Sequence, residues 1–251
     1  EAFEYRIEFF LSLAGWFVRL AIALFIWAAV FKDQNTVGNY NFESILTYFL
    51  LIQIVVTLVF SRVGFQVGED IHTGDFSNYL TRPISYTLYQ IFSELSRNLL
   101  RTFMGALAFL SVLAILYPSF FSNFKLIKIP IVIVILLMAY SMNALISCSI
   151  GYTGFWLTNS NRLMYVYFAI ITAISGMTAP LDLFPPQILN IMNYLPFSYI
   201  FYYPVKVIQA DINWSLTTFV LTRQLLFLGI LLLLNQTLYK RGVKKYEAVG
   251  R

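Results

Sequence analysis

The residues best suited to chemistry lie in one polar stretch, VGEDIHTGDFSNYLTRPIS at positions 67–85, which contains the only histidine of the chain. His72 lies near the carboxylates of Glu69, Asp70 and Asp75, a set that could bind a metal ion or form a histidine-dependent hydrolase triad. A single histidine cannot form a histidine cluster for zinc, and a solvated polar turn explains these residues better. We therefore expect no metal site and no catalytic residue in this chain.

The sequence also lacks the two features with which a membrane protein could drive transport by itself, an ATP-binding loop and carboxylates in the middle of its spans. No lysine follows a glycine, so the phosphate-binding loop G-x-x-x-x-G-K-[ST] is absent and the chain is not expected to hydrolyse ATP. Ion-coupled carriers usually place carboxylates in the middle of membrane spans, whereas the acidic residues here fall at span ends and in loops. Uphill transport would need energy from another subunit.

The composition shows which elements must position the polar stretch. Hydrophobic residues make up 59% of the 251 and charged residues 12%, and the mean hydropathy is +0.72. A soluble domain usually has about twice that charged fraction. The apolar residues form continuous blocks of about 20, the length of a helix that crosses a bilayer. We predict an all-α integral membrane protein, because strands of a β-barrel would alternate in polarity.

We predict one transmembrane domain over residues 1–251 with six spans. The spans are expected at residues 9–31, 42–60, 99–117, 129–150, 163–180 and 215–238. An even number of spans places both termini on one side of the membrane, and that side has eleven Lys and Arg residues against four on the other. Because basic loops stay in the cytoplasm, we expect both termini to be cytoplasmic and the protein to lie in a bacterial or archaeal plasma membrane.

The polar stretch then lies on the cytoplasmic side, between the second and third spans. Gly64 and Gly68 are expected to mark the exit from the second span. Asp75 is expected to cap a short helix at 76–81, because a carboxylate accepts hydrogen bonds from the free amides of a first turn. Pro83 would end that helix. The sequence predicts a short transverse helix between two bends, which is suited to docking a partner.

A second irregular region lies between the fifth and sixth spans, on the outer side. Its prolines are Pro180, Pro185, Pro186, Pro196 and Pro204. Pro185 and Pro186 are expected to begin one short helix and a second is expected at 199–209, neither long enough to cross the bilayer. Two interpretations stay open. Half-helices could close the outer end of a pathway, with Pro185, Pro186, Pro196 and Tyr199 at the gate, or the region is an aromatic cap at the membrane interface.

Two arginines fall within predicted spans, Arg19 in the first and Arg223 in the sixth. A charge deep in the bilayer costs about 2.5–3.5 kcal/mol unless it reaches the interface or faces a polar partner. Either residue could line a transport pathway. The structural alternative is a buried hydrogen bond to a backbone carbonyl, near Gly15 in the case of Arg19.

The tail after the sixth span has four cations, Lys240, Arg241, Lys244 and Lys245. An anionic inner leaflet attracts each of them by about 1 kcal/mol. They are expected to act as a topology anchor, and a contact with a cytoplasmic partner is the alternative.

Several segments together resemble a known family of membrane proteins. They are YRIEFF before the first span, EDIHTGDFSNYLTRPIS after the second, SGMTAPLDLFP…LPFSYIFYYP after the fifth, and the tail YKRGVKKYEAVGR. Over essentially its whole length the chain resembles six-span permeases of the ABC-2 type, with DI-x-x-G-x-x-x-x-x-L-x-RP as the most specific pattern. The family usually has a longer cytoplasmic N-terminus, and since the first residue is Glu1 rather than Met we expect the protein to begin further upstream.

The resemblance implies a non-catalytic permease of an ATP-driven exporter. Two permease subunits, identical or related, would pack over two cytoplasmic ATPase subunits, which would bind ATP and Mg²⁺ while this chain holds no cofactor. The cargo would be amphipathic or hydrophobic, such as a drug, peptide, lipid or glycolipid. The alternative is a channel or scaffold that uses no ATP.

The resemblance also assigns a role to residues 69–82, as a coupling helix between the permease and its ATPase. Asp75 would cap this helix. Phe76, Tyr79 and Leu80 would form its packing surface, with flanking charges from Glu69, Asp70 and Arg82.

Overall fold

The computed structural model describes residues 15, 18, 21–22, 24–118 and 125–246 of the chain. Within these residues the structure is helical, with one isolated bridge between Val37 and Tyr40 and no strand. The helices are α2 (Phe42–Val59), α3 (Val63–Thr73), α4 (Ser77–Leu80), α5 (Tyr86–Leu116), η1 (Leu126–Lys128), α7 (Ile129–Tyr152), η2 (Thr153–Phe155), α8 (Asn161–Ile174), η3 (Leu181–Leu183), α9 (Pro186–Asn193), α10 (Phe197–Ile200), α11 (Tyr202–Gln209) and α12 (Trp214–Lys245).

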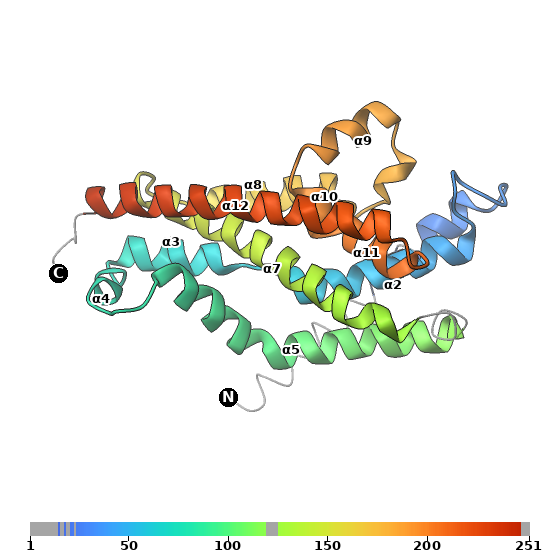
Figure 1. The fold of residues 1–251 in the computed structure, drawn as a ribbon, viewed down its shortest axis with the longest axis horizontal. Helices are drawn as coiled ribbons and strands as arrows, with labels where there is room; N and C mark the ends of the chain where they lie inside the picture. Colours follow the sequence, from blue (N-terminus) through green and yellow to red (C-terminus); the bar gives the residue numbers. More distant parts are fainter. Residues whose placement is uncertain (1–14, 16–17, 19–20, 23, 119–124, 247–251) are drawn as a thin grey trace.

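The long helices run side by side along the longest axis of the molecule (Figure 1). The central helix α7 packs against α12, α3 and α2, while α5 packs against α2. One end of the bundle holds α3, α4 and the end of α12, and the other holds the starts of α2 and α12 together with α11 (Figure 1). The polar stretch therefore lies at one end of the bundle, and α11, from the proline-rich region, lies at the other (Figure 1).

Three stretches in the described part of the chain are long and apolar enough to cross a membrane. They are Phe42–Thr73, Leu126–Phe155 and Trp214–Lys245, and a fourth is counted if the two halves of α5, which meet at a bend, form one span. Residues 24–30 of the predicted first span are helical. The all-helical membrane fold is confirmed, whereas the six-span topology stays a prediction.

Helix α2 ends at Val59, close to residue 60 where the second span was predicted to end, but the sequence did not predict the helix that follows it. The helix breaks only at residues 60–62 and then continues as α3, because other helices bind the backbone groups that the break leaves free. Asn143 of α7 donates from Nδ2 to the Val59 carbonyl (3.1 Å), and the Arg62 amide donates to the Glu94 carboxylate (2.6 Å). Ser61 also donates to Glu94 (2.5 Å). Irregular backbone at membrane depth needs such partners, since lipid cannot supply them.

Gly64 and Gly68 lie inside α3 rather than at the exit of a span. Gly64 allows α3 to approach α7 closely, and Gly68 allows it to approach the start of α8. A Cβ at Gly64 would lie 2.2 Å from the carbonyl oxygen of Ser147, and a Cβ at Gly68 would lie 2.2 Å from Oγ of Ser160. On the facing side, a Cβ at Gly151 would meet the Gly64 carbonyl at 2.7 Å. Small residues at helix crossings are typical of membrane bundles.

Helix α8, in the region of the fifth predicted span, is shorter than the span expected at residues 163–180. Helix α8 ends at Ile174, and Gly176 follows in the left-handed region at φ +88°. Its 14 residues form a helix of about 21 Å, shorter than the hydrocarbon core of about 30 Å. The expected helix at 199–209 is divided into α10 and α11 at Phe201, whereas the expected start at Pro186 is confirmed.

Candidate functional site

The polar stretch forms a tight turn followed by α4. Gly74 ends α3 in the left-handed conformation, at φ +90°. The residue before α4 is Phe76, and no side chain caps the helix. The predicted cap by Asp75 is therefore wrong. The Asp75 carboxylate instead accepts a hydrogen bond from Oγ1 of Thr73 (2.8 Å), which holds it back over the end of α3.

The structure does not place Phe76 on an outer packing surface. Its side chain is fully buried, and its ring contacts Tyr86, Phe155, Tyr239 and Tyr246 at centroid distances of 4.8–6.1 Å. These partners come from α5, η2 and the end of α12. Phe76 therefore joins the α4 turn to three other elements of the same chain.

Asp70 is likewise buried rather than a flanking charge. Its carboxylate accepts hydrogen bonds from Gln66 (2.7 Å), Tyr86 (2.7 Å) and Gln90 (2.5 Å). Gln66 lies one turn earlier on α3, and the other two donors lie on α5. Three donors compensate the burial of one carboxylate, so Asp70 fixes the start of α5 against α3.

Leu80, predicted as part of the packing surface, is 44% exposed. Ile84 in the turn after α4 is 59% exposed, and Leu88 in the first turn of α5 is 52% exposed. Glu69, Asp75 and Arg82 are also exposed. We call Leu80, Arg82, Ile84 and Leu88 the α4 surface. Ile84 was missed in the sequence because it follows Pro83 and belongs to no helical periodicity.

Tyr79 lies between the buried turn and this surface. Its ring contacts Tyr86 at 5.0 Å and Tyr89 at 5.2 Å, and the Arg82 guanidinium lies 5.1 Å from the ring centroid. Burial, with smaller contributions from Asp70 and Tyr89, raises the pKa of the Tyr79 phenol. Tyr79 therefore packs between α5 and Arg82 of the α4 surface, and the next residue, Leu80, is more exposed.

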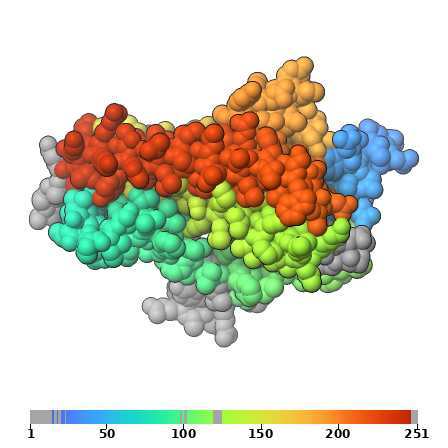
Figure 2. All heavy atoms as spheres, viewed as in Figure 1, coloured from blue at the N-terminus to red at the C-terminus, as the bar shows by residue number. Residues whose placement is uncertain are grey.

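The end of α12 completes this end of the molecule. The Tyr246 hydroxyl donates to the Gly74 carbonyl (3.0 Å). A Cβ at Gly242 would lie 2.0 Å from the Phe155 ring, so the last turns of α12 press closely on η2. Figure 2 shows the segment of α3 and α4, in teal, lying against the end of α12, in red.

The opposite end is joined by a polar cluster that the sequence did not predict. Lys206 of α11 forms an ion pair with Asp182 (3.0 Å), and the Tyr40 hydroxyl donates to both carboxylate oxygens (2.9 and 3.0 Å). Lys206 also donates to the Tyr40 hydroxyl (3.0 Å). Burial, and secondarily the charge of Asp182, raises the pKa of Tyr40. The cluster ties η3 and α11 to the residues before α2.

The predicted gate residues divide between an outlying helix and the core. Pro185 and Pro186 begin α9, which stands out from the body of the molecule (Figure 2, orange). Pro196 precedes α10, where Tyr199 is fully buried and stacks on Tyr203 at 4.8 Å. Gln224 of α12 donates to the Tyr199 carbonyl (2.9 Å). The four residues therefore do not form one cluster.

Of the two arginines predicted within spans, Arg223 is half-buried on α12, and its guanidinium lies 5.5 Å from the ring centroid of Phe219. Arg19 lies outside the described residues. Within those residues the structure also brings together no group of three or more His, Cys, Asp or Glu side chains suited to a metal ion.

In a comparison with protein-family models, residues 17–250 match the model described as "ABC-2 family transporter protein". A search of curated proteins gives no match. The family match spans all the helices described above, including both the α4 surface and the polar cluster at the opposite end.

Proposed function

Because the chain belongs to the ABC-2 family of transporter proteins, we propose that it is the membrane permease subunit of an ATP-driven ABC exporter. ATP and Mg²⁺ would bind to separate cytoplasmic ATPase subunits, two in each complex, beneath two permease subunits that are identical or related. The cargo would be amphipathic or hydrophobic. The protein would lie in the plasma membrane with both termini in the cytoplasm.

The observation that carries the proposal is the α4 surface at one end of the bundle. It combines exposed apolar side chains with the exposed charges of Glu69, Asp75 and Arg82. An apolar centre with a charged rim is typical of protein interfaces. A cytoplasmic ATPase of the same complex is the partner that the family membership suggests.

The distribution of basic residues supports a cytoplasmic position for this end. Arg82 lies in the α4 segment, and Lys240, Arg241, Lys244 and Lys245 lie in the last turns of α12, which contact the same segment through Tyr246. The opposite end has fewer Lys and Arg residues, four against eleven, and they are Lys32, Lys125, Lys128 and Lys206. This asymmetry follows the positive-inside rule.

In the proposed mechanism, ATP binding closes the ATPase dimer and moves the α4 surface. The membrane helices would move together with α4, because buried contacts join α4 to its neighbours. Phe76 packs on η2 and α12, while Asp70 joins α3 to α5. The Gly64–Gly151 crossing joins α3 to α7. A switch from inward to outward access would therefore involve α3, α5, α7 and α12 together.

The test uses the full chain, purified from its own host membranes with its associated proteins. We expect a protein with a phosphate-binding loop and ATPase activity to co-purify. Replacing Leu80 and Ile84 together with Ala should weaken that association, since buried interface anchors often contribute about 2 kcal/mol or more. His72→Ala is the control, because His72 is also exposed but polar and outside the α4 surface.

Two results would overturn the proposal. If the double variant keeps its ATPase and its ATP-driven export at the level of His72→Ala, the α4 surface does not couple the two subunits. If no ATPase associates with the wild-type chain, a channel or scaffold that uses no ATP becomes the better interpretation. Unchanged thermal unfolding of the double variant would show that its effect is confined to the surface.

A further inference from the structure

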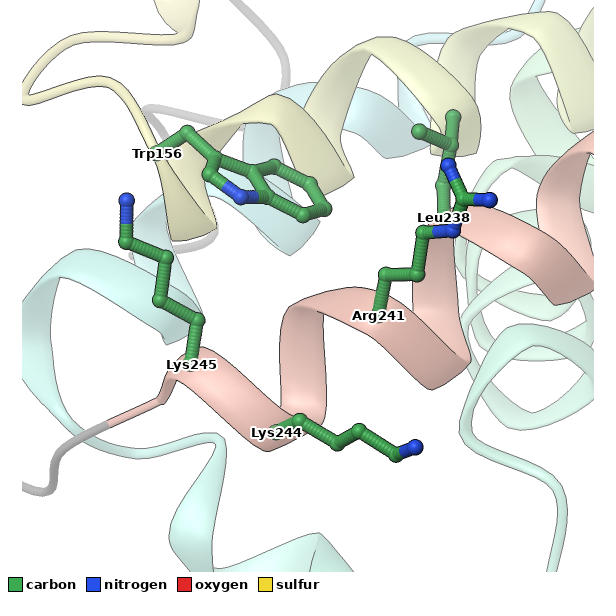
Figure 3. A pocket seen from close by; sticks show the side chains of 5 residues that line it. All are labelled: Trp156, Leu238, Arg241, Lys244 and Lys245. Atoms are coloured by element: carbon green, nitrogen blue, oxygen red, sulfur yellow. The ribbon is translucent and has the colours of Figure 1, made fainter.

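An open groove lies beside the last turns of α12. It has a volume of about 510 Å³ and is lined by Trp156, Leu238, Arg241, Lys244 and Lys245. Figure 3 shows Trp156, on the connection between α7 and α8, facing α12 across the groove. Arg241 and Lys245 extend on the two sides of the indole, and Lys244 points away from it (Figure 3). The groove thus combines an aromatic wall with one cation on each side of it.

The groove continues an apolar stripe on α12. Ile230, Leu234, Leu238, Arg241 and Lys245 follow at the spacing of one helical face. Ile230 and Leu234 are about half exposed. The face is therefore apolar along the membrane-spanning part of the helix and becomes basic at its end. An anionic phospholipid is complementary to this face, because its acyl chain is apolar and its headgroup is negatively charged.

The cations of the groove have no acidic partner among the residues that the structure describes. The ion pair present among the described residues, between Lys206 and Asp182, lies at the other end of the bundle from the groove. Trp156 and the next residue, Leu157, are both exposed, at 40% and 46%. Tryptophan with an apolar neighbour is typical of the membrane–water interface. These features place the groove where a lipid headgroup would lie, and its charge selects an anionic one.

We propose that the groove binds the phosphate of an anionic phospholipid, between Arg241 and Lys245 and against the Trp156 indole, with an acyl chain along Ile230 and Leu234. A guanidinium and an ammonium together match a phosphodiester. The proposal requires only that this end of the bundle meets a membrane surface. It does not depend on the ATPase or on the direction of transport.

The test compares two charge-matched pairs of substitutions in the full chain. Arg241→Gln with Lys245→Gln removes one arginine and one lysine from the groove. Arg162→Gln with Lys240→Gln removes the same charges from exposed positions that do not line the groove. Binding of phosphatidylglycerol relative to phosphatidylcholine is measured by native mass spectrometry of the purified protein, titrated with each lipid. Inorganic phosphate is added in a separate arm.

We expect the wild type to prefer phosphatidylglycerol, and the groove pair to reduce that preference about tenfold or more. The control pair should reduce it less than about twofold, since dispersed surface charges are screened by salt. Four results would overturn the proposal. They are equal losses in both pairs, no lipid preference in the wild type, displacement of the lipid by inorganic phosphate alone, or a groove pair that loses the ATPase but keeps its lipid preference.

Discussion

Replacing Gly64 with Ala tests the close packing of α3 on α7. The new Cβ would lie 2.2 Å from the Ser147 carbonyl oxygen and 2.7 Å from Sδ of Met164. The thioether can move, but the carbonyl belongs to the backbone of α7, so the two helices would have to separate by about 1 Å. The same separation would stretch the hydrogen bond from the Gly64 amide to Oγ of Ser147, now 2.8 Å.

Overpacking of this kind costs about 1–3 kcal/mol. Gly229 of α12 provides the matched control, because a Cβ added there has no atom within 4 Å. In an exposed helix Gly→Ala is neutral or stabilising by up to about 1 kcal/mol. The free energies of unfolding of the two variants should therefore differ by about 1–4 kcal/mol.

The assay is equilibrium unfolding of the purified chain in mixed micelles, titrated with a denaturing detergent and followed by tryptophan fluorescence. Ser147→Ala, which removes the hydroxyl acceptor but keeps the carbonyl, should cost only about 0.5–1.5 kcal/mol. A Gly64→Ala chain as stable as Gly229→Ala would refute the claim that α3 and α7 need a glycine at their crossing.

Three further predictions concern the two ends of the bundle. Phe76→Ala should lower the free energy of unfolding by about 3–5 kcal/mol and expose the α4 turn to protease, whereas Leu80→Ala should do neither; equal protease resistance of the two variants would contradict the burial of Phe76. Tyr246→Phe should cost about 0.5–1.5 kcal/mol at neutral pH. Burial raises the pKa of Tyr246, so the protonated hydroxyl contributes fully to stability below about pH 10, and this contribution is lost as the pH rises further. If the Phe variant loses as much stability at alkaline pH as the wild type, the Tyr246 hydroxyl is not the group that titrates. Asp182→Asn should cost about 1.5–3 kcal/mol, because two donors lose a charged acceptor, while Asp33→Asn, at an exposed position, should change stability little; similar values for both would show that the polar cluster contributes nothing.

The sequence predicted the elements whose signals are local. Helix α2 begins at Phe42 as expected, with Asn41 accepting from the Ser44 amide (2.8 Å). The start of α9 at Pro186 follows from the fixed φ of proline. The family was also recognisable from short motifs. These features depend on neighbouring residues, so one sequence contains enough information to place them.

The errors arose where distant residues decide the outcome. The break at residues 60–62 is followed by α3 because Asn143 and Glu94 bind its free backbone groups, and no local pattern indicates their approach. Phe76 resembled a surface anchor because its aromatic partners Phe155, Tyr239 and Tyr246 are far away in sequence. Asp70 resembled a solvated charge for the same reason, since its donors on α5 become neighbours only in the folded chain.

The contact between Tyr246 and Gly74 also affects how the protein is made. These residues are 172 positions apart, and translation produces Gly74 long before Tyr246. Of the four ring neighbours of Phe76, only Tyr86 is synthesised soon after it, and the other three follow at positions 155, 239 and 246. Contacts so distant form late in folding. The α4 turn therefore completes its packing only after α12 has been synthesised and inserted, so a nascent chain that stalls before its last helix would not present a finished surface to an assembly partner.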